Sequence, residues 1–142
     1  MKRKKNITLI TNSVEILYEL SDHNDWNILS TGGTLKPGAL SLVGSTAEKM
    51  IRDFHVDIAI CSCKGVDINA GITDSNEKDS QMKQAIFSAA GRKVLAIDST
   101  KFDRIAFTKV CDLGDVDVIV TDSRPSDKWI EYLDDCKTEL VY

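Results

Sequence analysis

Polar residues and glycines follow four apolar runs of the sequence, and these residues have the clearest potential for chemistry. They are Asn12-Ser13, Thr31-Gly32-Gly33-Thr34, Cys63-Lys64-Gly65 and Asp98-Ser99-Thr100-Lys101. Glycines let backbone N–H groups approach an anion, and hydroxyls, amides and helix N-termini add further stabilisation. Lys64 and Lys101 would supply the positive charge. Ordinary turn chemistry explains any one of these segments, but the four together favour a site for a small, polar, phosphorylated ligand.

Motifs of other site classes are missing from the sequence. No GxGxxG fingerprint follows the first apolar run and no GxxxxGK[ST] occurs, so neither a dinucleotide nor a nucleoside triphosphate is favoured. His23 and His55 have no suggested Ser or Cys partner and are interpreted as surface residues. The cysteines lack the Cys-x-x-Cys spacing of metal sites and are interpreted as reduced thiols: Cys61, Cys63, Cys111 and Cys136. We therefore expect neither a metal nor a cofactor.

The segments that must position these residues alternate between strands and helices. Strands are predicted at Ile7–Thr11, Trp26–Ser30, Asp57–Ser62, Lys93–Ile97 and Val116–Thr121, with Thr138–Tyr142 as a candidate last strand. Four helices are predicted. Ser13 is the expected N-cap of the first, and Ser45 with Glu48 forms an expected capping box at the start of the second. Asn76 is the expected N-cap of the third, which Gly91 closes, and Pro125 stands where the fourth would start. This alternation predicts an α/β fold with a mainly parallel sheet and helices on both faces. The carboxyl ends of its strands would line one edge, where ligands bind.

The length and charge of the chain narrow its organisation and partners. A chain of 142 residues fits one domain, predicted at residues 6–142 after a basic stub or linker at residues 1–5. Four of the 18 basic residues lie in Lys2–Lys5, which leaves 14 basic against 22 acidic residues elsewhere. This acidic remainder of the chain would repel the phosphates of a nucleic acid. No membrane span or signal peptide is evident, and we expect a cytoplasmic protein.

Several stretches form an ordered set that spans nearly the whole chain. They are Ile7–Ser13 with its Thr-Asn-Ser end, the Gly-Gly loop Leu29–Leu35, the short strand Leu42–Gly44, the Gly-x-Thr turn Asp67–Thr73, the helix pattern Met82–Ile86, the element Asp98–Phe102 and the strand end Ile119–Asp122. The set resembles the C-terminal domain of DeoR-type transcription regulators.

The resemblance implies a sugar-phosphate-isomerase-like fold, shared with ribose-phosphate isomerases and CoA transferases. It also implies a non-enzymatic sensor of phosphorylated sugars or related metabolites, which we expect to serve a repressor of sugar metabolism. The family is expected to form homo-oligomers and to bind DNA through a helix-turn-helix, which cannot be placed in this chain. The residues expected to contact sugar hydroxyls or phosphate are Lys83, Asp98 and Lys101, and those expected to line the crevice are Asn12, Gly32, Gly33 and Lys64.

The sequence departs from the family pattern and leaves alternatives open. The family's Asp-x-Gly-Thr-Thr loop is absent, so we expect a domain truncated on its N-terminal side. Asp79 and Gln81 stand where the family has Glu and an acidic residue. One alternative is a sugar-phosphate isomerase that uses Asp98 as a carboxylate base. Another is an interaction domain whose role is oligomerisation.

Overall fold

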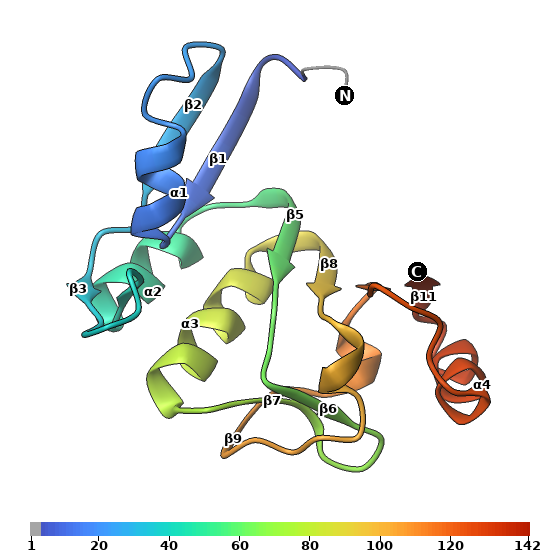
Figure 1. Ribbon diagram of the computed structural model, residues 1–142. Coiled ribbons are helices and arrows are strands. Elements are labelled where there is room, and N and C mark those ends of the chain that lie inside the picture. Colours follow the sequence, from blue (N-terminus) through green and yellow to red (C-terminus); the bar gives the residue numbers. More distant parts are fainter. Residues whose placement is uncertain (1–3) are drawn as a thin grey trace. The chain divides into compact units, whose positions relative to one another are not determined.

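The computed structural model describes residues 4–142. The chain divides into two compact units, an N-terminal unit of Met1–Asp53 and a C-terminal unit of Phe54–Tyr142 (Figure 1). Residues 1–3 of the predicted basic stub lie outside the described residues. None of the helices within residues 4–142 is long and apolar enough to cross a membrane.

A parallel pair of strands opens the N-terminal unit. β1 (Ile7–Thr11) and β2 (Trp26–Ser30) have the predicted bounds and pair in parallel, and α1 (Val14–Glu19) connects them. Their β-branched and aromatic residues favour extended backbone. The hydroxyl of Ser13 accepts a hydrogen bond from the Ile16 N–H at 3.2 Å, which confirms Ser13 as the N-cap.

A short hairpin and a helix complete the N-terminal unit. β3 (Thr34–Leu35) and β4 (Leu42–Val43) pair antiparallel, and α2 (Ser45–Arg52) follows. The predicted capping box of Ser45 and Glu48 is wrong. Gly44 is the N-cap, with a φ of 99° and no side-chain cap. Its carbonyl accepts the first helical bond from the Glu48 N–H at 3.1 Å, so Ser45 already lies inside the helix.

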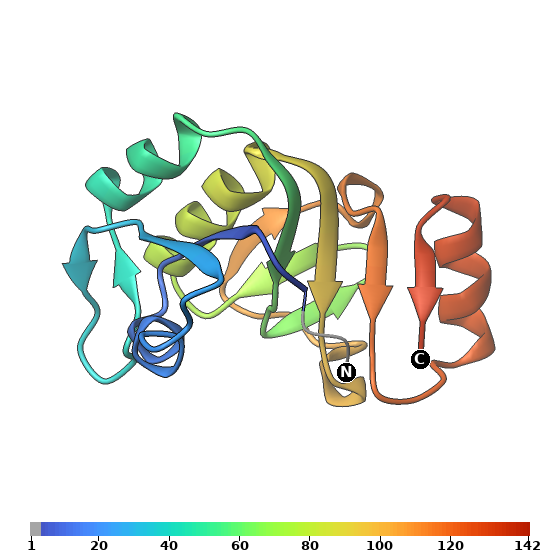
Figure 2. The ribbon, with the colours of Figure 1, turned by 90° about the horizontal axis from the view of Figure 1, so that it is seen from above.

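The main sheet of the C-terminal unit is parallel throughout. Its four strands are β5 (Val56–Cys61), β8 (Ala90–Ala96), β10 (Val118–Val120) and β11 (Glu139–Val141), in the order β11-β10-β8-β5. Figure 2 shows them running side by side in one direction, with α4 (Asp127–Asp135) beyond β11. On β5, Ala59 and Cys61 are buried, whereas Ile58 and Ile60 on the opposite face are exposed. The predicted α/β class with a mainly parallel sheet is confirmed, although strand ends shift by one to three residues.

The helix α3 (Glu77–Ser88) begins as predicted but ends earlier. The side chain of Asn76 accepts a hydrogen bond from the Asp79 N–H at 2.9 Å, which confirms the N-cap. The prediction that Gly91 closes the helix is wrong, because the C-cap is Ala89 and β8 begins at Ala90. Gly91 therefore lies in the strand that pairs with β5.

A second sheet in the C-terminal unit is antiparallel and was not expected from the sequence. It contains β6 (Gly65–Asp67), β7 (Gly71–Asp74) and β9 (Thr108–Cys111), in the order β6-β7-β9. Gly71, with a φ of 79°, allows the close approach of β7 and β9, since a Cβ there would lie 2.7 Å from the Cys111 carbonyl oxygen. This sheet supplies β7, whose last residue belongs to the site described below.

The core of the C-terminal unit joins its two sheets to α4. It includes Ile72 of β7, Leu95 of β8 and Trp129 of α4, all fully buried. The Trp129 Nε1 donates a hydrogen bond to the Asp103 Oδ1 at 3.1 Å, so the buried indole has its polar partner. The helix α4 begins two residues after Pro125, behind an N-cap at Ser126.

Candidate functional site

The carboxyl ends of β5 and β8 meet at one edge of the main sheet. The two strands are parallel neighbours, with Cys61 beside Leu95 at their ends. Cys63 and Lys64 follow β5, and Asp98 follows β8. The C-terminal unit therefore brings Lys64 and Asp98, two of the predicted site residues, to the same edge of one sheet.

Asp98 caps the 3-10 helix Ser99–Lys101 and pairs loosely with its last residue. Its Oδ1 accepts hydrogen bonds from the Thr100 N–H, at 2.9 Å, and from the Thr100 hydroxyl. Its Oδ2 lies 3.5 Å from the Lys101 Nζ. The hydrogen bonds from Thr100 hold the pKa of Asp98 below its ordinary value of 3.8. A carboxylate with a lowered pKa is a weak proton acceptor at neutral pH, so this geometry suits binding better than general-base catalysis.

Lys83 lies on α3 and is paired with a buried acid, Asp74, the last residue of β7. The Lys83 ammonium group binds the Asp74 Oδ2, and the Ser75 N–H donates to the Asp74 Oδ1 at 2.7 Å. The side chain of Asp74 is 1% exposed and that of Lys83 is 22% exposed. Lys83 is therefore held at the boundary between the interior and solvent.

Backbone contacts bring the segments that carry these lysines together. The Lys64 N–H donates to the carbonyl oxygen of Thr73, next to Asp74, at 3.1 Å, and Val66 forms a β-bridge with Phe102, next to Lys101. Burial raises the pKa of the Cys63 thiol to about 11. Lys64, its chain neighbour, is exposed. The predicted residues Lys64, Lys83, Asp98 and Lys101 thus gather in the C-terminal unit, and we call them the lysine edge.

In the N-terminal unit, Asn12 ties the end of β1 to β4. Its Nδ2 donates to the Leu42 carbonyl oxygen at 3.0 Å, and its own carbonyl oxygen accepts from the Leu42 N–H at 2.8 Å. The first bond gives the side-chain amide of Asn12 a structural task, and the second, to its backbone carbonyl, joins the chain to β4 where β1 ends.

Gly32 and Gly33 follow the neighbouring strand β2 and are required by backbone geometry. Their φ angles are 63° and 104°. A Cβ on Gly33 would lie 2.8 Å from both the Ala47 Cβ and the Val43 carbonyl oxygen, whereas one on Gly32 would meet open space. Since β1 and β2 are parallel, the two glycines lie with Asn12 at one edge of that pair.

Asp74 was missed by the sequence analysis. Its position offered a signal, since it follows the Gly-x-Thr turn and stands two residues before Asn76, the N-cap of the helix that carries Lys83. That signal gives no indication of burial, which arises because β7 is covered along its whole length.

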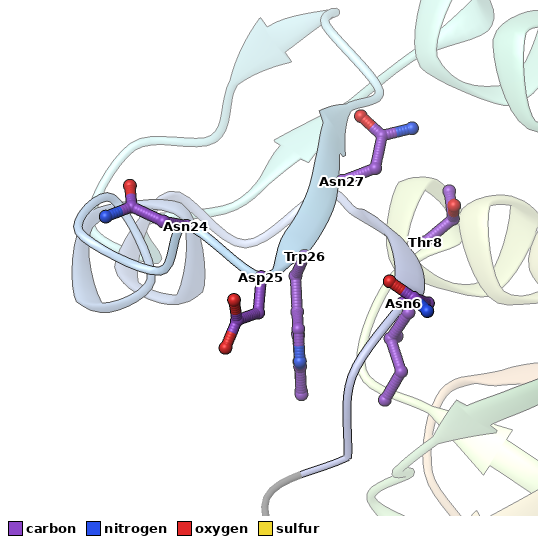
Figure 3. Close-up of a pocket in the computed structure, with 7 residues that line it drawn as sticks. Asn6, Thr8, Asn24, Asp25, Trp26 and Asn27 are labelled. Atoms are coloured by element: carbon purple, nitrogen blue, oxygen red, sulfur yellow. The ribbon is translucent and has the colours of Figure 1, made fainter.

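The N-terminal unit also contains a shallow pocket of about 440 Å³ that holds none of the predicted residues. Figure 3 shows Trp26 beside Asp25 and Asn6, at the amino ends of β1 and β2. The Trp26 Nε1 already donates to the Lys4 carbonyl oxygen at 3.0 Å, and the indole stacks on His23 with ring centroids 4.9 Å apart. Asp25 is the one charged residue among those that line it, so the pocket disfavours an anion.

The cysteines are free, with Cys61 and Cys63 buried and Cys111 and Cys136 partly buried. Burial raises the pKa of both Cys61 and Cys111 to about 12. Within residues 4–142, no group of three or more His, Cys, Asp or Glu side chains is arranged to hold a metal ion.

Comparison with known proteins identifies the family. A family model described as the DeoR C terminal sensor domain matches residues 1–123. The chain is 34% identical over 135 residues to the uncharacterized HTH-type transcriptional regulator YulB of Bacillus subtilis (strain 168), covering 95% of this chain and 52% of that protein. It is 28% identical to the L-fucose operon activator of Haemophilus influenzae, covering 88% and 50% of the two chains. It is 29% identical to the HTH-type transcriptional repressor GlcR of Bacillus subtilis, covering 94% and 52%.

The chain belongs to the family of DeoR C-terminal sensor domains, which confirms the resemblance found in the sequence. It spans about half the length of the curated relatives it matches. Its α/β architecture agrees with the isomerase-like fold of this domain. The family regulates sugar operons, and its members include an activator and a repressor. Because the relatives are transcription regulators, the expectation of a sensor domain is confirmed and the isomerase alternative is not supported.

Proposed function

We propose that this chain senses a phosphorylated sugar, whose anionic group binds at the lysine edge of the C-terminal unit. The observation that carries the proposal is that Lys64 follows β5, while Asp98 and Lys101 follow its parallel neighbour β8 at the same edge of the sheet. Clustered cations in a chain with a net charge of −4 give a local site for an anion. Asp98 accepts hydrogen bonds and would serve a sugar hydroxyl.

We propose a second, separate contact region for a ligand in the N-terminal unit, formed by Asn12, Gly32 and Gly33. Its exposed glycine backbone at Gly32 suits the approach of a polar ligand.

The remaining parts of the proposal concern the intact regulator. The names of relatives such as YulB and GlcR include a helix-turn-helix, so we assign DNA binding to such a segment outside this chain. Effector binding would alter DNA affinity by favouring one of two states of the regulator. We further propose a homo-oligomer that works in the cytoplasm, where a transcription regulator meets its operator. The fucose operon activator among the relatives supports a sugar effector.

Isothermal titration against a panel of sugar phosphates and their unphosphorylated sugars tests the proposal. We expect a phosphorylated member to bind at least about tenfold more tightly than its parent sugar, since charge-assisted hydrogen bonds are the stronger ones. Lys101→Gln should weaken that binding about fivefold, because it removes one ionic contact.

Lys128→Gln is the matched control, since it removes the same charge from the exposed side of α4. It should leave the affinity unchanged within twofold. Absence of binding by every sugar phosphate at millimolar concentration refutes the proposal. Equal losses in the two variants would assign the effect to net charge and not to the lysine edge.

A further inference from the structure

Lys83 and Lys101 have counter-ions with very different freedom to move. Asp98, the partner of Lys101, is 51% exposed, and the two charged groups lie 3.5 Å apart. Thr100 holds the Asp98 Oδ1, but water reaches this carboxylate and screens its attraction for Lys101, so an anion can compete for Lys101. Asp74, the partner of Lys83, is 1% exposed. It cannot leave Lys83 without becoming an unpaired buried charge, which is strongly unfavourable.

A partly buried polar cluster holds Asp74 in place. The Thr108 hydroxyl lies 3.2 Å from the Asp74 carbonyl oxygen and 2.5 Å from the Ser80 Oγ, and Ser80 is itself buried. The Ser75 N–H holds the carboxylate oxygen that Lys83 does not use. The cluster links β7, β9 and α3 and so holds the backbone of Asp74, while Lys83 and the Ser75 N–H bind its carboxylate.

The pairing changes what Lys83 can recognise. A lysine ammonium group has three N–H donors, and Asp74 occupies one of them. The charge of the pair sums to zero, so an incoming anion gains little net attraction from it. The other donors keep their hydrogen-bonding capacity, and the side chain reaches solvent. A neutral oxygen, such as a hydroxyl or carbonyl, therefore suits Lys83 better than a phosphate does.

We propose that Asp74 is a positioning residue that assigns Lys83 to the uncharged part of the ligand and leaves the anionic group to Lys101 and Lys64. This inference rests on the function proposed above and divides the lysine edge into two parts. Lys83 with Asp74 selects the sugar, and Lys101 with Lys64 binds the phosphate.

NMR titrations with inorganic phosphate, a probe without sugar oxygens, separate the two parts. Lys101→Gln should weaken phosphate binding about fivefold. Lys83→Gln should weaken it about threefold, because it leaves the Asp74 charge without a counter-ion. Asp74→Asn should strengthen it about threefold or more, because it removes the counter-ion of Lys83. The double variant Asp74→Asn/Lys83→Gln carries neither charge and should bind phosphate as the unchanged chain does.

The sugar phosphate that binds most tightly in the panel provides the second probe. Lys83→Gln should weaken its binding about tenfold, since it loses a charge-assisted hydrogen bond. Asp74→Asn should narrow the preference for this probe over inorganic phosphate by a similar factor. A purely structural role for Asp74 predicts instead that both probes bind more weakly. If Lys83→Gln does not fold, Asp74→Asn and the double variant still distinguish the two cases.

Weaker phosphate binding by the double variant than by the unchanged chain overturns the inference, as does unchanged or weaker phosphate binding by Asp74→Asn. These outcomes leave the proposed function intact, because the unchanged chain still binds both probes. The failure of the unchanged chain to bind any sugar phosphate refutes the proposed function itself.

Discussion

Replacing Lys83 by glutamine should lower the free energy of unfolding by about 3–5 kcal/mol, because it leaves the Asp74 carboxylate buried without a counter-ion. Replacing Asp74 by asparagine should cost less, about 1–2 kcal/mol, since it removes one charged hydrogen bond. The asymmetry follows from burial: the side chain of Lys83 is 22% exposed and can reach water, whereas that of Asp74 is 1% exposed and cannot. The double variant should resemble Asp74→Asn, so the coupling energy should equal the cost of Lys83→Gln, about 3–5 kcal/mol.

Urea unfolding at pH 7 measures these energies. The two tryptophans lie in different units, Trp26 on β2 and Trp129 on α4. In a Trp26→Phe background the fluorescence of the buried Trp129 reports on the C-terminal unit alone. Slopes against urea concentration should agree among the four proteins, so that midpoints compare stability directly.

Two results would refute this reasoning. If Lys83→Gln costs no more than Asp74→Asn, the carboxylate is not the buried partner that the structure describes. If the coupling energy is below about 0.5 kcal/mol, the two groups do not interact strongly enough for one to position the other.

Three further predictions concern the glycine loop, a buried thiol and the capping carboxylate. Gly33→Ala should lower the free energy of unfolding of the N-terminal unit by about 2–4 kcal/mol in urea, and Gly32→Ala should lower it by about 1–2 kcal/mol. Both variants place alanine at a positive φ, but only the Cβ of Gly33→Ala would also clash with α2. The pKa of the Cys63 thiol is raised to about 11, so iodoacetamide should alkylate Cys63 at pH 8 at least about a hundredfold more slowly than a free thiol. Peptide mass spectrometry measures this rate, and a rate equal to that of the free thiol contradicts the burial of Cys63. The NMR titration of Asp98 should give a pKa below 3.8, and Thr100→Ala should move it up toward that value; no change in the variant would exclude Thr100 as the cause.

Local signals in the sequence predicted several elements well. β1 is rich in β-branched residues and β2 contains Trp26 and Ile28, and the predicted bounds of both strands match the structure. The N-caps at Ser13 and Asn76 were also predicted, since a capping side chain bonds to a backbone N–H only three residues away. These features depend on neighbours in the chain and need no knowledge of packing.

Features that depend on distant partners were not predictable. The sheet of β6, β7 and β9 has strands of three or four residues, and the pairing of Ile72 with Cys111 joins segments far apart in the chain. Gly91 resembled a helix terminator, but the pairing of Val56 with Ala90 extends β8 up to and through it. The N-cap of α2 is Gly44 and not Ser45, because the positive φ of Gly44 lets the chain turn sharply after β4. Tertiary pairing decided these positions over local preference.

The sequence by itself determined the order of strands and helices, the family, and the presence of polar residues after the strands of a parallel sheet. The sequence specifies which residues are charged, but it does not show which of them form ion pairs. Only the tertiary structure decided that Lys83 is paired with Asp74 and that Lys101 faces the exposed Asp98. The physical reason is that the strength of an ionic contact depends on distance and burial, and both are set by the packing of elements that are separate in the chain.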